Sequence, residues 1–233
     1  MTGQAGAPLS PPLSPPRFAT VALDVDSTLA GVEGIDWLAA RRGGETAAFV
    51  RRLTDDAMSG RLTLEDAYER RIERIAPTRE DVRSLAQAYC AHLAAGAGAA
   101  IAQLRRAGVR VIAISGGVRE AVVPLCRAVS FEDEDVFAVD VRWDSQGRYV
   151  GFDRASPLVS QDGKAVVLRG LALPRPILAV GDGSTDLAMR TAGAADAFAA
   201  YTGFVNRPSV VAAADHVLTS FDELLAFVIP LLA

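Results

Sequence analysis

The sequence is poor in cysteine: Cys90 and Cys126 are the only two among 233 residues, and they lie far apart along the chain. Each occurs in an apolar, helix-like context, where a buried and reduced thiol is the ordinary role of a cysteine. Reduced thiols are typical of the cytoplasm. We therefore predict a cytoplasmic location.

An excess of positive charge is also absent. The chain has 24 Lys and Arg against 28 Asp and Glu, which gives a net charge of −4, and no stretch forms a basic stripe. Domains that bind nucleic acid usually carry such a stripe on one face. We expect no nucleic-acid partner.

The first sixteen residues contain no charged side chain, yet they hold five of the twelve prolines. They lack the basic start and the apolar stretch of a signal peptide. A segment of this composition buries too little apolar surface to order itself. We predict that residues 1–16 form a disordered, proline-rich tail. A polyproline ligand for a partner is the alternative.

Residues 84–104 likewise contain no Asp, Glu, Lys or Arg, over a length that would allow a membrane span. The segment is mostly Ala and Gly, however, and polar residues such as Gln87 and Gln103 interrupt it. It predicts two soluble helices that meet near Gly96 and Gly98, and we expect no contact with a membrane.

The sequence does contain enough apolar material for a core, since half of its residues are apolar and 22% are charged. Three runs, 19–25, 109–115 and 176–182, are almost entirely apolar, and each precedes a turn and a helical pattern. Strands buried on both faces show this pattern, so we predict an α/β fold with a parallel sheet. The alternation in 135–153 predicts a hairpin, and 197–201 and 216–220 predict further short strands.

Polar side chains stand at the ends of the three apolar runs. Because ligands of parallel sheets bind beyond the carboxyl ends of the strands, we expect Asp24, Ser115 and Asp182 to converge there. Asp26 points to the same side as Asp24, because residues i and i+2 of a strand share a face. Buried like charges repel each other, so the sequence indicates a cation that offsets them.

Residues 34–95 have a helical pattern without a strand, although a plain crossover between parallel strands needs far fewer residues. We predict a helical cap over residues 31–96, inserted after the first strand into a core formed by 17–30 and 97–233. Arg71 falls on the apolar face of a helix in this cap. It is either an edge residue whose stem covers apolar surface or an inward guanidinium that binds an anion.

Four motifs, in order, resemble the haloacid dehalogenase superfamily. They are Asp24-Val25-Asp26-Ser27-Thr28, Ser115-Gly116-Gly117 at a strand end, Lys164 at the start of a helical stretch, and "GDGSTD" at 181–186. The resemblance implies a three-layer, Rossmann-like core with an inserted cap. It also implies Mg²⁺-dependent transfer of a phosphoryl group through an aspartyl-phosphate, a reaction in which positioning and charge neutralisation dominate.

The same resemblance assigns roles to individual residues. Asp24 is the nucleophile, and Asp26 is the general acid and base. The remaining groups surround the metal and the phosphate: Asp24, Asp182 and the backbone carbonyl of Asp26 as Mg²⁺ ligands, Ser115 and the Gly116 N–H as phosphate ligands, Lys164 as a charge-offsetting cation, and Asp186 as a residue that orients the metal's ligands.

Within the superfamily, "DVDSTLAGVEGIDWLA" and "AMSGRLTLEDAYERRI" resemble the phosphoserine phosphatase family. This implies that Glu33 binds the substrate ammonium, that Arg71 binds its carboxylate by bidentate pairing, and that Met58 and Thr185 lie near the substrate. Leu64 stands where the family usually has phenylalanine. The stretch "YTGFVNRPSVV" is only loosely similar to the family.

Two other functions stay open on the sequence. The first is a related phosphatase or phosphotransferase that acts on another small phosphomonoester. The second is a signalling module whose aspartate merely accepts phosphate, but such a module needs neither Asp26 nor a cap. A monomer and a homodimer are equally compatible with the sequence.

Overall fold

The computed structural model describes residues 15–230, and the side chain of Met58 lies outside the described part. The predicted tail, residues 1–16, therefore falls almost wholly outside the described residues. At the start of the described chain, the Arg17 N–H donates to the Val228 carbonyl at 2.8 Å. The N-terminal segment thus enters the fold beside the last helix.

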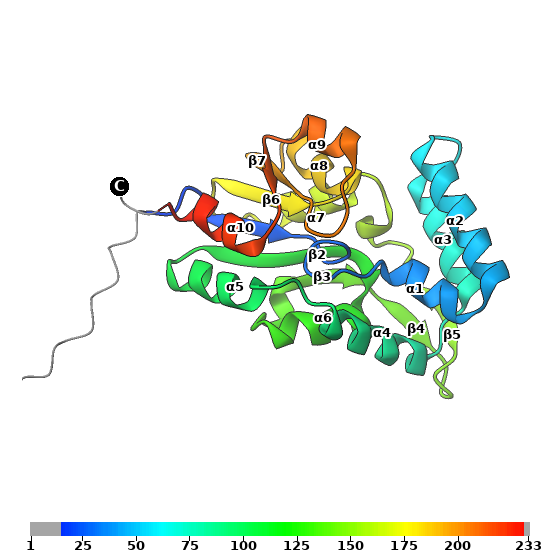
Figure 1. Ribbon diagram of the computed structural model, residues 1–233. Coiled ribbons are helices and arrows are strands. Elements are labelled where there is room, and N and C mark those ends of the chain that lie inside the picture. The colour runs from blue at the N-terminus through cyan, green and yellow to red at the C-terminus, as the bar shows by residue number, and fades with distance from the viewer. Residues whose placement is uncertain (1–14, 231–233) are drawn as a thin grey trace, which may run out of the picture.

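A six-stranded parallel sheet forms the centre of the molecule (Figure 1), in the order β3-β2-β1-β6-β7-β8. The pairing of β1 with β2 and β6 is in register, with Leu23 opposite Ala113 and Val180. The first strand is therefore central and buried on both sides. The strand bounds are β1 Thr20–Leu23, β2 Arg110–Val118, β3 Val136–Val139, β6 Ile177–Gly181, β7 Ala197–Tyr201 and β8 His216–Leu218.

Helices cover both faces of this sheet, which gives the three layers that the resemblance implied (Figure 1). One face carries α5 Ala97–Arg106 and α6 Arg119–Ala128, with α10 Phe221–Val228 packed beside α5. The other carries α7 Gly163–Gly170, α8 Ser184–Thr191 and α9 Pro208–Ala213. The predicted α/β class is confirmed. The core strands predicted at 19–25, 109–115, 176–182, 197–201 and 216–220 differ from the observed ones only at their ends. The segment 136–139, which the sequence analysis included in the hairpin, instead pairs with β2 in the main sheet as β3.

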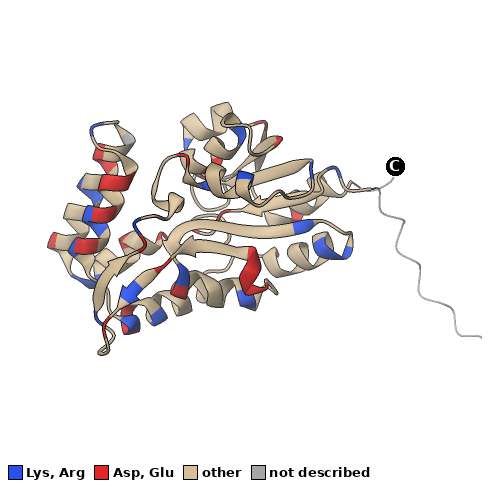
Figure 2. Ribbon diagram, turned by 180° about the vertical axis from the view of Figure 1, so that it is seen from behind, with Lys and Arg blue, Asp and Glu red and all other residues tan. Residues whose placement is uncertain are grey.

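Five helices lie in the connection between β1 and β2. The last of them is α5, and the four before it are α1 Gly34–Arg41, α2 Gly44–Met58, α3 Leu64–Ile75 and α4 Arg79–Ala91. The α2–α3 pair stands apart from the sheet, whereas α4 packs along α6 (Figure 1). Acidic and basic residues are interspersed along the standing pair (Figure 2). Local capping fixes the helix starts, because Thr63 accepts from the Asp66 N–H and Thr78 forms a capping box with Asp81.

The predicted hairpin exists as β4 Val141–Trp143 and β5 Tyr149–Phe152, a two-stranded antiparallel sheet separate from the main one. It turns through Asp144 and Gly147, where the Gly147 N–H donates to the Asp144 carbonyl at 3.0 Å. Just after β5, Arg154 pairs with Glu69 and Glu73 of α3. The segment after the hairpin is thus tied to the standing helix pair.

The uncharged segment 84–104 forms the end of α4 and most of α5. The two helices meet at Gly96, whose φ of 76° is readily adopted only by glycine. Within residues 15–230 no helix is long and apolar enough to cross a membrane.

Candidate active site

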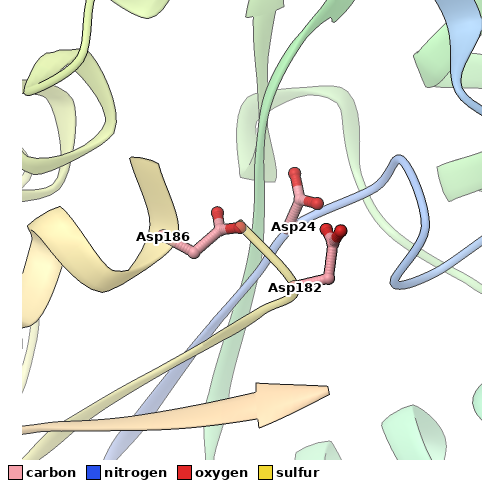
Figure 3. A group of neighbouring side chains, drawn as sticks. All are labelled: Asp24, Asp182 and Asp186. Carbon is pink, nitrogen blue, oxygen red and sulfur yellow. The ribbon is translucent and has the colours of Figure 1, made fainter. Parts of the chain in front are cut away.

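Three carboxylates gather at the carboxyl edge of the sheet (Figure 3). Asp24 follows β1, Asp182 follows β6, and Asp186 lies in the first turn of α8. Each offers an oxygen within 4.8 Å of the others, and all three are buried. The predicted convergence of Asp24 and Asp182 therefore occurs, and Asp186 joins them.

Lys164, in the first turn of α7, is the cation nearest this cluster. Its Nζ contacts a carboxylate oxygen of Asp24 and lies 2.6 Å from Asp186. Burial by itself lowers the pKa of Lys164, but the charges of Asp186 and Asp24 outweigh it and raise that pKa. Burial and repulsion by Asp24 raise the pKa of Asp186 to about 8. One lysine therefore does not neutralise the cluster.

The start of α7 packs closely against the Pro157 carbonyl because residue 163 is a glycine and has no side chain. A Cβ at Gly163 would lie 1.7 Å from the Pro157 carbonyl oxygen. Only glycine allows this approach, and it places the neighbouring Lys164 beside the carboxylates. The sequence analysis identified Lys164 but not the glycine that positions it.

Asp26 lies on the wall of the site, one residue after the buried Val25. Its Oδ1 accepts hydrogen bonds from the Gly34 N–H at 2.6 Å and the Tyr89 hydroxyl at 2.7 Å. Burial and the negative charge of Asp24 raise the pKa of Asp26 from 3.8 to about 6. A carboxyl group with such a pKa can carry a proton near neutral pH, as a general acid requires.

The end of β2 brings Ser115 and Gly116 to the same edge. Ser115 is fully buried, donates to Asp26 Oδ2 at 3.2 Å and accepts from the Gly117 N–H at 2.9 Å. Gly116 lines the cavity, and a Cβ there would lie 3.3 Å from the Leu158 carbonyl oxygen. Gly116 therefore faces the cavity, whereas Ser115 is buried behind the cavity wall beside Asp26.

A cavity of about 370 Å³ opens in front of the carboxylates, between the sheet edge and the α1–α3 region. A neighbouring hollow of about 380 Å³ shares part of its wall. The cavity is lined by most of the predicted site residues: Asp24, Asp26, Glu33, Arg71, Gly116, Lys164, Asp182, Thr185 and Asp186. Met58 is the last residue of α2, and its side chain lies outside the described part of the structure.

Arg71 faces this cavity from α3, opposite the carboxylate cluster. Its guanidinium donates to the Thr54 hydroxyl and to the Ala67 carbonyl, each at 3.2 Å. Among the described residues, no carboxylate lies within 4.0 Å of it, in contrast to Arg74 one turn away. Burial lowers the pKa of Arg71, which opposes the raising effect of Asp36. The guanidinium is therefore turned inward and available to an anion.

Glu33 lies at the entrance of α1 and also lines the cavity. It accepts hydrogen bonds from the Ser27 hydroxyl at 2.8 Å and from Arg207 at 3.1 Å. Burial, followed by the charges of Asp26 and Asp182, raises the pKa of Glu33 to about 7. The carboxylate thus sits among negative groups, where a cationic ligand would be favoured.

Arg207 is one of the site residues that the sequence analysis missed. It lies just before α9, in the stretch of weakest family resemblance, and it contacts Asp182 at 2.8 Å and Glu33 at 3.1 Å. Pro208, at the first position of α9, fixes where the helix begins after it. The dipeptide Arg-Pro in a loop is too common to have singled out this residue.

The donor set fits a hard divalent cation. Three buried carboxylates face Lys164 and Arg207, and the pKa of Asp182 is also raised, by burial and by Asp24. Carboxylate oxygens are the preferred ligands of Mg²⁺. A cation between Asp24 and Asp182 would offset the remaining repulsion.

Comparison with known proteins agrees with this geometry. The profile of haloacid dehalogenase-like hydrolases matches residues 21–190. The phosphoserine phosphatase of Mus musculus is 36% identical over 208 residues, which cover 88% of this chain and 91% of the mouse protein.

Two solved structures are similar in fold. One is a phosphoserine phosphohydrolase-like protein from Francisella tularensis, with a TM-score of 0.81 and 23% identity over 90% of this chain and 99% of the other. The other is a phospho-aspartyl intermediate analogue of phosphoserine phosphatase, with a TM-score of 0.73 and 24% identity over 90% of this chain and 98% of the other.

Proposed function

Because the chain belongs to the haloacid dehalogenase-like hydrolases, and within them to the family of the phosphoserine phosphatases, we propose that it hydrolyses O-phospho-L-serine to L-serine and phosphate. One observation carries this substrate: the inward guanidinium of Arg71, without a carboxylate partner among the described residues, faces the same cavity as Asp24. Phosphoserine supplies the carboxylate that such a group would bind.

In the first chemical step, a carboxylate oxygen of Asp24 attacks phosphorus and the bond between phosphorus and the serine oxygen breaks. The proton on Asp26 moves to the departing alkoxide, so serine leaves as the neutral alcohol. Lys164 and the Ser115 and Gly116 donors offset the charge on the transferred group. The raised pKa of Asp26 supports its role as the acid in this step.

In the second step, a water molecule attacks the phosphorus of the aspartyl-phosphate. Asp26, now ionised, accepts a proton from that water while the bond to Asp24 breaks. Phosphate is released and both aspartates return to their starting states. The same carboxyl group therefore acts as acid and then as base, which a pKa near neutrality permits.

The metal in this proposal is Mg²⁺, held by Asp24, Asp182 and the backbone carbonyl of Asp26. When bound, it neutralises charge on the phosphate and orients it for attack. Asp186 contacts Lys164 and accepts from the Gly183 N–H at 3.0 Å. These bonds hold Asp186 behind the other two aspartates, where it orients rather than binds.

The two charged ends of the amino acid find separate partners. Arg71 binds the carboxylate as a planar fork, and Glu33 accepts from the ammonium. Thr185, on the cavity wall, lies near the substrate. Ser27 and Arg207 both donate to Oε1 of Glu33, so Oε2 is the oxygen that accepts from the ammonium.

Residues 31–96 act as the cap in this proposal, inserted into a core of 17–30 and 97–233. The cavity lies where α2 and α3 meet the sheet edge, and the Arg154 pairs with Glu69 and Glu73 tie α3 to the core. Closure of such a cap excludes water from the reacting phosphate.

A cytoplasmic location also belongs to the proposal. Cys90 and Cys126 are both free thiols. Cys126 is buried as expected, whereas Cys90 is exposed, so the expectation of burial was wrong for Cys90. Reduced cysteines of this kind are the ordinary state in that compartment.

The test compares two substrates that share a phosphate and an ammonium. Phosphoethanolamine lacks only the carboxylate of phosphoserine, so Arg71→Ala should lower kcat/KM for phosphoserine by roughly 30- to 1000-fold and for phosphoethanolamine far less. Arg71→Lys should recover only part of the loss, because an ammonium cannot form the planar fork. The exposed neighbour provides the matched control, and Arg70→Ala should leave the ratio unchanged.

If Arg71→Ala left the ratio of kcat/KM for phosphoserine to kcat/KM for phosphoethanolamine unchanged, Arg71 would not bind the substrate carboxylate. The main argument for phosphoserine as the substrate would then fail. A wild-type enzyme that ignored phosphoserine but hydrolysed another small phosphomonoester well would reject the substrate and keep the reaction.

A further inference from the structure

The two oxygens of Asp26 have different surroundings. Two donors, the Gly34 N–H and the Tyr89 hydroxyl, occupy Oδ1 at 2.6 and 2.7 Å. Oδ2 has only the longer contact of 3.2 Å from the hydroxyl of Ser115, which is buried near the end of β2. The carboxyl group is thus fixed in rotation, with one oxygen saturated by donors and the other free for exchange.

Tyr89 reaches this carboxylate from outside the cavity. It lies on α4, its side chain is fully buried, and it is not among the residues that line the cavity. Its hydroxyl donates only to Asp26 among the described residues. Tyr89 therefore touches the proposed acid and base but is not placed to touch substrate.

The approach of Tyr89 depends on the glycine at position 34. A Cβ on Gly34 would lie 2.2 Å from the Tyr89 hydroxyl oxygen and 3.1 Å from Asp26 Oδ1. Any side chain at 34 would displace the hydroxyl. Gly34 thus donates its N–H to Asp26 and, because it has no side chain, leaves the space that the Tyr89 hydroxyl fills.

From this geometry we propose that Tyr89 is a positioning residue for the reaction, which holds Asp26 so that Oδ2 is the oxygen that exchanges the proton. With two donors on Oδ1, the proton of the neutral carboxyl group resides on Oδ2. That proton moves to the alkoxide as the bond between phosphorus and oxygen breaks, and a proton from water returns to Oδ2 in the second step. This inference rests on the role given to Asp26 in the proposed function.

The phenol is suited to this task because it remains a donor throughout. A tyrosine hydroxyl has an ordinary pKa of about 10, so it keeps its proton at neutral pH. The hydrogen bond therefore persists whether Asp26 carries a proton or not, and the rotation of the carboxyl group is preserved between the two steps.

The variant Tyr89→Phe removes the hydroxyl and keeps the ring. We expect kcat on the physiological monoester to fall by about 10-fold, with KM changed by less than about twofold, because the cavity wall is untouched. The matched control is Tyr201→Phe, a buried tyrosine on β7 outside the site, which should leave both constants unchanged.

Two further measurements separate positioning from a general loss of packing. In a double-mutant cycle, Tyr89→Phe should cost nothing further in an Asp26→Asn background, because the group it positions is already inactive. With p-nitrophenyl phosphate, whose leaving group needs little protonation, the initial release of nitrophenol should keep the wild-type rate while steady-state turnover falls, so a burst should appear.

Wild-type kcat in Tyr89→Phe, or an equal loss with and without Asp26, would overturn the inference. If Tyr89→Phe fails to fold, Gly34→Ala, whose methyl displaces the hydroxyl, must give the same split between kcat and KM. If phosphoserine is not the substrate, the double-mutant cycle of Tyr89 and Asp26 is measured with the phosphomonoester that the wild type hydrolyses fastest. Failure of the substrate proposal is then distinguishable from failure of this one.

Discussion

The guanidinium of Arg207 lies 2.8 Å from the carboxylate of Asp182, the residue to which we assign a metal-binding role. A second nitrogen of the same guanidinium lies 3.1 Å from Glu33. The carboxylate of Asp182 is thus already paired with a protein side chain, although a metal ion would bind the same carboxylate. The two cations compete for the charge of Asp182.

This competition predicts the effect of Arg207→Gln on metal binding. Without the guanidinium, Asp182 keeps its full charge for the metal, so Mg²⁺ should bind more tightly by about fivefold, or roughly 1 kcal/mol. Isothermal titration of the substrate-free protein measures this directly. Arg154→Gln, which removes an arginine paired with α3 instead, should not change the affinity. Weaker binding in Arg207→Gln would mean that Arg207 supports the metal site.

The metal-free protein should lose stability as the pH rises from about 5 to about 8. The pKa values of Asp26 and Asp186 are raised to about 6 and about 8, so each carboxyl group favours folding while protonated. Their contribution is complete below their unfolded pKa of 3.8 and is lost as the pH passes through the folded values. The melting temperature should fall by roughly 5–15 °C over this range.

The control for this prediction is the metal itself. Saturating Mg²⁺ should stabilise the protein most at the higher pH, where the carboxylates are ionised, by about 2–3 kcal/mol at 100 times Kd. Asp186→Asn should flatten the pH dependence of the metal-free protein. A melting temperature that rose between pH 5 and pH 8 without metal would contradict the proposal that ionised, buried Asp26 and Asp186 destabilise the fold.

Two glycines of one helix should respond in opposite ways to the same substitution. Gly163→Ala places a methyl 1.7 Å from the Pro157 carbonyl oxygen, so it should destabilise the fold by about 1–3 kcal/mol and displace Lys164. Gly170→Ala, at the other end of α7, meets nothing within 4 Å and should be neutral or stabilising by up to about 1 kcal/mol. Denaturant unfolding of the two variants measures the difference. Similar stabilities would show that the Gly163 contact relaxes at little cost.

Substitutions of the two aspartates after β1 should separate their roles. Asp24→Asn should abolish the covalent intermediate, because an amide is a poor nucleophile, and acid quenching after mixing with labelled substrate should trap none. Asp26→Asn keeps the backbone carbonyl and should lower kcat by roughly 10²- to 10⁴-fold. Normal turnover in Asp26→Asn would exclude it as the acid and base.

Much of this architecture could be predicted because its signals are local. The apolar runs before Asp24 and Asp182 predicted neighbouring strands, and the period-2 rule placed Asp26 near Asp24. The hairpin followed from its turn residues, and the helices between β1 and β2 followed from the helical pattern and the length of residues 34–95. Each of these inferences needed only residues close together in sequence.

The rest depended on contacts that no local pattern encodes. Tyr89 and Arg207 reach the site from a buried helix face and a loop, and their neighbours in sequence carry no chemistry. The orientation of Arg71, open on the sequence, was decided by its packing against Thr54 on another helix. The need for glycine at 163 became visible only when the Pro157 carbonyl was in place.

The position of β1 at the centre of the sheet also determines the order in which the protein can be built. Thr20 pairs with Arg110 on one side and with Ile177 on the other, so β1 leaves the ribosome before either of its partner strands. Contacts of such wide sequence separation close large loops and slow folding. Until β6 has been synthesised, β1 has an unpaired side that is open to association with other chains. The two aspartates to which we assign metal binding, Asp24 and Asp182, are therefore brought together only after β6 has been synthesised.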